Sequence, residues 1–345
     1  MNRVARLYAW GDVRIEDTPM PEPDAGEIVV RVEACGLCGS DALTWYVEKK
    51  APVVLGHEPV GTVSAVGRDV DSIKIGDRVF VHHHAPCMEC ENCRRKLWSN
   101  CALWKRNALE PGGFAQYVLV RAHAVVRDTL PIPAEMTAET ATFIEPLACC
   151  IRATKRHGHI EPGDRVLIVG LGAMGLLMVQ LARLYGASTI VGSDFLGERR
   201  ERALLGGAHY AFDPRAERQA QEAQELLQQR GADVVIVCPG DARAVQNGIE
   251  WAAPGARVVC FTPMPPDEPV ALDLSAMYFK EISLHQSYSC GPDETREALE
   301  LLRQKYVEVD SLITHREGLA GVAAALQRAH GKGDGLKSVI LPWKD

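Results

Sequence analysis

The stretch that decides the fold is residues 165–175, RVLIVGLGAMG. Residues 165–169 are almost all apolar and predict a strand buried on both faces, as in parallel sheets that are covered by helices. Residues 170–175 match the pattern G-x-G-x-x-G, and the apolar residues that follow predict a helix. A glycine motif between a strand and a helix predicts the phosphate-binding turn of a dinucleotide-binding unit.

Each position of this motif has a physical task. Gly170 allows the tight turn, Gly172 lets the backbone approach a pyrophosphate, and Gly175 lets the helix pack on the sheet. Ala173 and Met174 lie in the first turn of the predicted helix, where free N–H groups attract phosphate oxygens. We expect all five residues to contact a dinucleotide; the alternative is a tight turn without a ligand.

An acidic residue stands where such a unit recognises the ribose. Asp194 follows the next predicted strand, residues 188–192, close to the step of about 20 residues that is usual from the glycine motif. A carboxylate there accepts hydrogen bonds from the ribose hydroxyls and repels a 2′-phosphate, which predicts NAD. Arg199 and Arg200 keep NADP open, because an arginine can bind that phosphate. Arg199 is included among the expected cofactor contacts.

The predicted pattern of strands and helices differs between the parts of the chain before and after residue 163. Residues 4–126 hold short strands separated by glycine and proline, which predicts an antiparallel β domain. From residue 163 onward, apolar strands alternate with helices, which predicts a parallel sheet and an α/β fold. From residue 294 onward, the pattern predicts two helices and a closing strand at residues 337–341.

Composition excludes several classes of protein. The chain has 345 residues, a net charge of −7 and 47% hydrophobic residues, with no block of lysine or arginine. We therefore expect no nucleic-acid partner. The first residues do not read as a signal peptide, and no stretch has the length of about 20 apolar residues that spans a membrane. Eleven cysteines without an export signal suit reduced thiols, partly bound to metal, in the cytoplasm.

Four of these cysteines are clustered with the spacing C-x2-C-x2-C-x7-C. A single zinc ion can take all four thiolates in a tetrahedral site that has no open position, so the site would be structural. Two disulfides or a chance cluster are the alternatives. The expected ligands are Cys87, Cys90, Cys93 and Cys101.

A second set of residues has the composition of a catalytic metal site. Such sites use three N, S or O ligands and keep one position open for water or substrate. Cys38 lies in the sequence CGSD, His57 and Glu58 lie in GHEP, and Glu145 lies in EPL just before the glycine-rich unit.

With these motifs in order, the chain resembles the zinc-dependent medium-chain alcohol dehydrogenases, in the branch that holds sorbitol (polyol) and threonine dehydrogenases. The segments LITH at 312–315 and GLK at 335–337 match as well. The resemblance implies a GroES-like catalytic domain from residues 1–147 and 290–345 and a Rossmann NAD-binding domain from residues 148–289. It also implies two zinc ions, NAD and a homo-oligomer, either a tetramer or a dimer.

The resemblance also assigns the catalytic ligands. Cys38 and His57 would bind the zinc ion, and Glu58, Glu145 or a water would complete the set. Glu145 occupies the motif that carries the third ligand in the polyol branch. Two cysteines that follow it closely, at positions 149 and 150, are competing ligands.

Two neighbours of Cys38 would support the chemistry. Asp41 would accept a hydrogen bond from the ring nitrogen of His57 that faces away from the metal and so fix the tautomer of the ring. Ser40 would accept the proton of the alcohol; a serine that only caps a helix is the alternative.

One position departs from the family. Many relatives have a histidine where this chain has Leu43, so the proton must leave by another route, through the ribose, Thr44 or a different histidine. His84, three residues before Cys87, is a candidate, because threonine dehydrogenases carry an active-site histidine there. If residues 82–84 continue a strand, alternation keeps the three histidines from lining one pocket.

We therefore expect an NAD-dependent zinc enzyme that oxidises a secondary alcohol of a polyol, sugar, cyclitol or amino alcohol. The alternatives are an NADP-dependent ketone reductase of a biosynthetic pathway and a zinc- and nucleotide-binding module without turnover. A zinc-free quinone reductase of the same fold is disfavoured by the set of Cys38, His57 and Glu145. The expected partner is a small alcohol or ketone, with no membrane and no nucleic acid.

Overall fold

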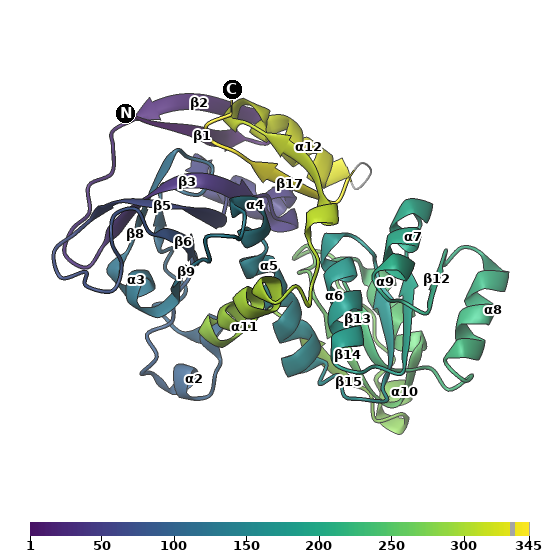
Figure 1. The fold of residues 1–345 in the computed structure, drawn as a ribbon. Coiled ribbons are helices and arrows are strands. Elements are labelled where there is room, and N and C mark those ends of the chain that lie inside the picture. The colour runs from purple at the N-terminus through teal and green to yellow at the C-terminus, as the bar shows by residue number, and fades with distance from the viewer. Residues whose placement is uncertain (332–334, 345) are drawn as a thin grey trace. The chain divides into compact units, whose positions relative to one another are not determined.

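The computed structural model describes residues 1–331 and 335–344, in two compact units. The first unit combines residues 1–148 with residues 290–345, so both ends of the chain belong to it (Figure 1). The second unit is residues 149–289. Residues 332–334 and 345 of the first predicted domain lie outside the described part. Within the described residues, no helix has both the length and the apolar character needed to cross a membrane.

The first unit is built on two mainly antiparallel sheets. The small sheet has the order β2-β1-β4, and the large one has the order β16-β17-β3-β5-β6-β9, with β8 paired to β3 and β7 paired to β8. The strands are β1 Asn2–Ala9, β2 Asp12–Thr18, β3 Ile28–Gly36, β4 Val53–Val54, β5 Glu58–Val66, β6 Arg78–Val81, β7 Leu109–Glu110, β8 Tyr117–Val120, β9 Thr129–Pro131, β16 Ile313–Glu317 and β17 Lys337–Ile340.

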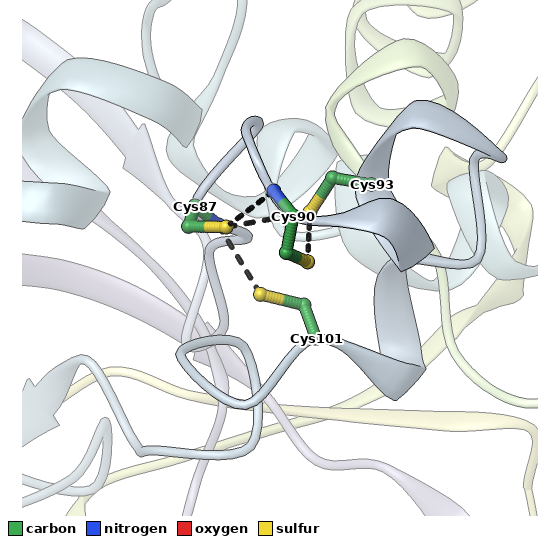
Figure 2. Close-up of side chains that lie close together, drawn as sticks. All are labelled: Cys87, Cys90, Cys93 and Cys101. Carbon is green, nitrogen blue, oxygen red and sulfur yellow. Dashed lines mark hydrogen bonds between the residues drawn. The ribbon is translucent and has the colours of Figure 1, made fainter.

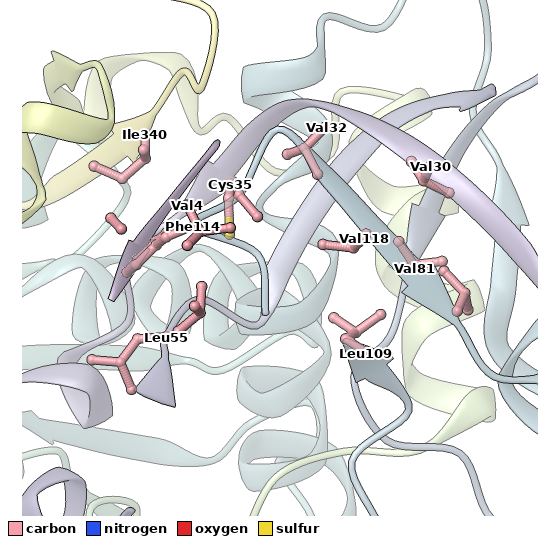
Figure 3. Close-up of a cluster of buried hydrophobic side chains, with 14 of the residues drawn as sticks. Val4, Val30, Val32, Cys35, Leu55, Val81, Leu109, Phe114, Val118 and Ile340 are labelled. Atoms are coloured by element: carbon pink, nitrogen blue, oxygen red, sulfur yellow. The ribbon is translucent and has the colours of Figure 1, made fainter. Parts of the chain in front are cut away.

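Apolar residues at alternate strand positions fill the interior of this unit. Val30 and Val32 of β3 are fully buried and belong to one cluster with Phe114 and Val118 (Figure 3). Burial of one such side chain stabilises the fold by about 1.5–3 kcal/mol. The helices are short except at the C-terminal end: α1 Thr44–Val47, α2 Glu91–Arg94, α3 Ala122–Asp128, α4 Ala138–Ala141, α11 Pro292–Arg303 and α12 Val322–Gly331.

The second unit is a parallel sheet of six strands in the order β12-β11-β10-β13-β14-β15. The central strand β10 carries the apolar run before the glycine motif, and α6 packs on it. The elements are β10 Arg165–Val169, α6 Ala173–Leu184, β11 Thr189–Ser193, α7 Gly197–Leu205, β12 Tyr210–Phe212, α8 Glu217–Leu226, β13 Ala232–Val237, α9 Ala242–Glu250, β14 Ala252–Cys260, α10 Leu274–Phe279 and β15 Ser283–Gln286. Helix α5 (Ile144–Ile151) includes the last residues of the first unit and the first of the second.

The predicted fold class is confirmed: a GroES-like antiparallel domain and a Rossmann sheet are both present. The structure differs from the sequence predictions at the ends of some strands. β6 ends at Val81, so residues 82–84 do not continue a strand and the expected alternation of the three histidines does not apply. Strand β8 begins at Tyr117, and the backbone of Phe114 before it forms hydrogen bonds with Ala5 and Leu55.

Candidate active site

The catalytic group forms where two paired strands of the first unit meet. Cys38 follows β3, and His57 and Glu58 lie at the start of β5, which pairs antiparallel with β3 so that Gly36 faces Glu58. Cys38, His57 and Glu58 each place one ligand atom within 4.8 Å of the others. Residues that lie about 20 positions apart in the sequence are thus joined by the strand register.

Asp41 holds two members of this group. Its Oδ1 lies 3.3 Å from Nδ1 of His57, and its Oδ2 accepts a hydrogen bond of 3.2 Å from the backbone N–H of Cys38. Burial lowers the pKa of His57, but the charges and hydrogen bonds of Asp41 and Cys38 together raise that pKa well above its ordinary value. The pocket therefore favours a positive charge, which is the condition that a bound metal cation satisfies.

A buried ion pair lies behind the same group. Lys337 Nζ, at the start of β17, lies 2.8 Å from Oε1 and 2.6 Å from Oε2 of Glu58, and both side chains are almost completely buried. Burial lowers the pKa of Lys337, but the acidic groups around it, Glu58 first and then Cys38 and Glu145, together raise that pKa above its ordinary value. A Cβ built at Gly36 would lie 1.8 Å from Glu58 Oε2, so only glycine leaves room for this carboxylate. Sequence reasoning did not assign a site role to Lys337, although it quoted the motif that contains it.

Glu145 and Ser40 lie in the same unit. Glu145 is in the first turn of α5 and is buried, and its ligand atom lies within 4.8 Å of those of His82 and His83. The charge of Glu145 also contributes to the raised pKa of Glu58, whose largest cause is burial. Ser40 is half-buried in the short turn between Cys38 and Asp41.

The three consecutive histidines lie close together after the end of β6. The ring centroids of His82 and His83 are 5.1 Å apart, those of His83 and His84 are 4.0 Å apart, and His83 lies 4.7 Å from His57. His84 lies 4.0 Å from the ring of Trp104, and burial lowers its pKa to about 3. His84 is therefore a neutral ring at the margin of the group, and His83 is the histidine that adjoins the ligand His57.

The four-cysteine lobe, residues 87–101, brings its sulfur atoms together as a metal site requires (Figure 2). The Sγ of Cys93 lies 3.8 Å from that of Cys87 and 3.5 Å from that of Cys90. Zn–S bonds of about 2.3 Å at tetrahedral angles put sulfur atoms about 3.8 Å apart, so the spacing fits zinc. The backbone N–H groups of Glu89 and Cys90 point at Cys87 Sγ and lower the pKa of this thiol to about 6.

The lobe is attached to the start of α11 within the same unit. Lys96 Nζ lies 2.6 Å from Asp293 Oδ2, and the buried Trp98 ring lies against Gly291. A Cβ built at Gly291 would lie 1.9 Å from Trp98 Cδ1, so the helix start and the tryptophan are in direct contact.

In the second unit, the three glycines of the motif differ in what surrounds them. Gly170 has a φ of +87°, which a residue with a side chain rarely adopts. A Cβ built at Gly175 would lie 2.0 Å from the carbonyl oxygen of Gly170, so close packing of α6 requires glycine there. At Gly172, by contrast, a Cβ would meet no atom of the described residues within 4 Å. The open space at Gly172 lies at the start of α6, beside Ala173 and Met174, where phosphates bind.

Asp194 follows β11 and faces the same turn. Its Oδ2 accepts a hydrogen bond of 2.8 Å from the N–H of Leu171, and its Oδ1 accepts one of 2.9 Å from the N–H of Leu196. Arg199 lies 3.7 Å from this carboxylate, and Arg200 donates a hydrogen bond of 2.8 Å to the backbone oxygen of Asp194. A carboxylate and two arginines therefore share the edge where the ribose of a dinucleotide would lie.

The residues fit the groups that the sequence implies. A thiol, an imidazole and a carboxylate in mutual reach are donors that suit zinc, and the orienting Asp41 is typical of a metal-bound histidine. The second unit offers an open helix start for phosphates. The arrangement can thus hold one structural zinc ion, one catalytic zinc ion and a nicotinamide dinucleotide, which is the equipment of a hydride-transferring enzyme.

Comparisons with known proteins agree. Residues 24–134 match the alcohol dehydrogenase GroES-like domain, and residues 173–304 match the zinc-binding dehydrogenase domain. Sorbitol dehydrogenase of Bacillus subtilis is 29% identical over 99% of this chain and 97% of its own length. D-xylulose reductase A of Aspergillus oryzae is 30% identical over 95% of this chain and 93% of its own. A zinc-binding dehydrogenase of Sinorhizobium meliloti, solved with NADP, is 31% identical and covers 99% of both chains with a TM-score of 0.86. The chain therefore belongs to the zinc-dependent medium-chain alcohol dehydrogenases, enzymes that act on alcohols with NAD or NADP.

Proposed function

We propose that this enzyme oxidises a secondary alcohol group of a polyol, sugar, cyclitol or amino alcohol with NAD as the hydride acceptor. The observation that carries the proposal is the group of Cys38, His57 and Glu58, with Asp41 behind the histidine. The similarity to a sorbitol dehydrogenase and to a D-xylulose reductase along almost the whole chain supports the substrate class.

Some residues of the first unit would bind the metal ion, and others hold those residues in position. A zinc ion held by Cys38 and His57, with Glu58, Glu145 or a water, supplies a Lewis acid that lowers the pKa of an alcohol hydroxyl group. Asp41 keeps the His57 ring oriented, and Lys337 holds the Glu58 carboxylate.

The hydroxyl proton needs an acceptor and a path. Ser40 Oγ takes the proton, and its half-buried position gives a short path to water. Leu43 supplies no relay group, so the proton leaves through Ser40 itself or through the histidines beside His57. His83 is the nearest of these, and His84 lines the same cluster through its contact with the His83 ring.

We infer NAD in preference to NADP from the charge of Asp194. A buried carboxylate next to the ribose position repels the 2′-phosphate of NADP. The ion pair of Asp194 with Arg199 and the proximity of Arg200 favour NADP instead, because an arginine can bind the 2′-phosphate. The solved relative that holds NADP, 31% identical, supports this alternative as well. Direct comparison of the two cofactors decides between them.

We also propose that the enzyme is a homo-oligomer formed through the second unit. Strand β15 is an edge of the six-stranded sheet, and an exposed edge can pair with a second copy. Next to it, α10 exposes three large apolar side chains: Leu274, Tyr278 and Phe279. Adjacent apolar side chains with this exposure mark a protein-binding surface.

The activity test uses zinc-replete enzyme with a panel of polyols, sugars, cyclitols and amino alcohols. With NAD or NADP, we expect reduced cofactor to appear for at least one secondary alcohol, with higher kcat/KM for NAD. If every secondary alcohol fails with both cofactors, the proposed function is wrong.

The catalytic group is tested by Cys38→Ser. Activity should fall at least about a thousandfold, because a metal ligand next to the reacting group is lost. Cys260→Ser is the matched control, since this buried thiol lies in β14 of the other unit. Full activity of the Cys38 variant would remove the proposed catalytic zinc.

A further inference from the structure

Two carboxylates lie side by side where adjacent strands of the second unit end. Strand β11 ends at Ser193 and β12 ends at Phe212, and these two residues are partners in the parallel ladder. Asp194 and Asp213, the residues that follow the two strands, therefore lie at the same edge of the sheet. The backbone N–H of Asp194 also donates a hydrogen bond of 3.1 Å to the carbonyl oxygen of Phe212. The edge where the ribose of a dinucleotide would lie thus has a second carboxylate beside the first.

Asp213 holds an arginine of the loop that follows β12. The guanidinium group of Arg215 donates a hydrogen bond of 2.9 Å to Oδ1 of Asp213 and one of 2.6 Å to Oδ2. The backbone N–H of Arg215 donates a further bond of 2.9 Å to Oδ1. A bidentate pair of this kind is among the strongest contacts between an arginine and a carboxylate. The side-chain hydrogen bonds of Arg215 are the largest cause that lowers the pKa of Asp213 to about 2, so this carboxylate is negative at neutral pH.

The same carboxylate lies next to an arginine of α7. Nη1 of Arg200 lies 3.8 Å from Oδ2 of Asp213 and donates a hydrogen bond of 2.8 Å to the backbone oxygen of Asp194. Helix α7 packs beside β12 (Figure 1). The guanidinium group of Arg200 therefore joins the two strand ends.

Both arginines thus lie at the ribose edge, and both already have Asp213 as a partner. Arg215 extends as far as the residue after Asp194: its guanidinium carbon lies 5.0 Å from the centroid of the Phe195 ring, and Nη2 donates a hydrogen bond of 3.4 Å to the Phe195 carbonyl oxygen. Arginine is the side chain that suits the 2′-phosphate of NADP. A phosphate at this edge would have to displace Asp213 from two arginines and would remain close to its negative charge.

We propose that Asp213 is a specificity-determining residue that keeps Arg200 and Arg215 from binding a 2′-phosphate. This role rests on the proposed function, in which NAD is the hydride acceptor, and gives that preference a second cause. Asp194 repels the phosphate directly, whereas Asp213 is a positioning residue that acts through the arginines it holds. Arginines at the ribose edge then do not make the enzyme dependent on NADP, because a carboxylate of the protein already occupies them.

The test measures the binding of two adenine nucleotides to the full-length, zinc-replete enzyme by isothermal titration calorimetry. The probes are adenosine 5′-monophosphate and adenosine 2′,5′-bisphosphate, which differ only in the 2′-phosphate. In Asp213→Asn, we expect the Kd of the bisphosphate to fall about tenfold or more, because charged hydrogen-bond donors become available to it. The Kd of the monophosphate should stay within about threefold of the wild-type value, because this probe lacks the group that the arginines would bind.

A second substitution and a matched control accompany this variant. Asp213→Ser should give the same shift, since serine keeps an acceptor for the backbone N–H of Arg215 and also removes the charge. Glu222→Gln removes the same charge from α8 of the same unit, where Glu222 pairs with Arg218 at 3.0 Å. This control also deprives an arginine of its partner, but away from the strand ends, and should keep the wild-type Kd for both probes.

A triple variant tests whether the arginines cause the effect. In Asp213→Asn with Arg200→Gln and Arg215→Gln, the gain in bisphosphate binding should disappear. A gain that persists would mean that Asp213 acts only by repulsion, and would overturn the proposal. An unchanged Kd for the bisphosphate in Asp213→Asn and Asp213→Ser would overturn it as well.

The same measurements separate this proposal from the proposed function. A wild type that binds the bisphosphate more tightly than the monophosphate would contradict the inference of NAD, and the role of Asp213 with it. A wild type that prefers the monophosphate, with no shift in the Asp213 variants, would contradict the role of Asp213 alone. Neither probe carries a nicotinamide ring or needs an alcohol, so failure of the substrate panel would leave every Kd unaffected.

Discussion

At the scale of single residues, short hydrogen bonds and ion pairs fix the orientation of the side chains in the candidate site. Asp41 fixes the ring of His57, Asp128 fixes the ring of His82, and Lys337 holds the carboxylate of Glu58. Each contact leaves its partner with one defined orientation. Asp194 is similar in the second unit, since both of its oxygens accept backbone N–H groups and its charge remains at the ribose position.

Removal of the charge of Asp194 should change cofactor preference. In Asp194→Asn, we expect the ratio of kcat/KM for NAD to that for NADP to fall by about tenfold or more, because contacts with a charged group contribute about 1.5–3 kcal/mol. Steady-state kinetics with both cofactors measure the ratio. Asp241→Asn removes the same charge at the first turn of α9 and should leave the ratio unchanged. An unaltered ratio in Asp194→Asn would mean that this residue does not discriminate.

At the scale of elements, the turn between β10 and α6 contains one glycine that helix packing requires and another that leaves space for a ligand. Gly175 is required by the protein itself, because a Cβ at this position would collide with the carbonyl oxygen of Gly170. Gly172 is not, because the space beside it is open within the described residues. This difference is invisible in the sequence, where all three glycines belong to one motif.

The two glycines should therefore respond differently to a methyl group. Gly175→Ala should reduce the free energy of unfolding by about 1–3 kcal/mol, the usual cost of overpacking. Gly172→Ala has an ordinary φ of −67°, so its stability should change by less than about 1 kcal/mol while the Kd for the dinucleotide rises more than tenfold. Denaturant unfolding and cofactor fluorescence titration measure the two effects. Normal dinucleotide affinity in Gly172→Ala would contradict the assigned phosphate site.

Elements that depend on a short stretch of sequence could be predicted. Contacts between residues far apart in the sequence could not. The strand–glycine–helix pattern lies within one short stretch, so the Rossmann sheet could be predicted from it. His82, Asp128 and Cys290 could not be grouped, since 46 residues separate the first two and 208 residues separate His82 from Cys290. The three-histidine run was misread for a local reason, because nothing in its composition marks the end of β6 at Val81.

At the scale of the whole molecule, the two units differ in what they leave exposed. The second unit ends its sheet at β15 and exposes Tyr278 and Phe279 on α10 beside it. Burial of such side chains by a second copy would recover about 1.5–3 kcal/mol for each.

Charged residues at this surface should therefore reduce the oligomeric state. In the double variant Tyr278→Lys with Phe279→Glu, we expect a smaller assembly than the wild type in sedimentation velocity. Leu205→Glu is the control, because Leu205 is an exposed apolar residue at the end of α7. A monomeric wild type, or a double variant with the wild-type mass, would show that this surface is not an interface.

The contact between the four-cysteine lobe and α11 has a consequence for the resistance of this helix to proteolysis. Trp98 of the lobe is in contact with Gly291, and Lys96 forms an ion pair with Asp293, two residues further on. An ion lost from the lobe would therefore loosen the start of α11 as well as the lobe itself. A metal that takes no part in the reaction would in this way protect a helix outside its own loop from proteolysis.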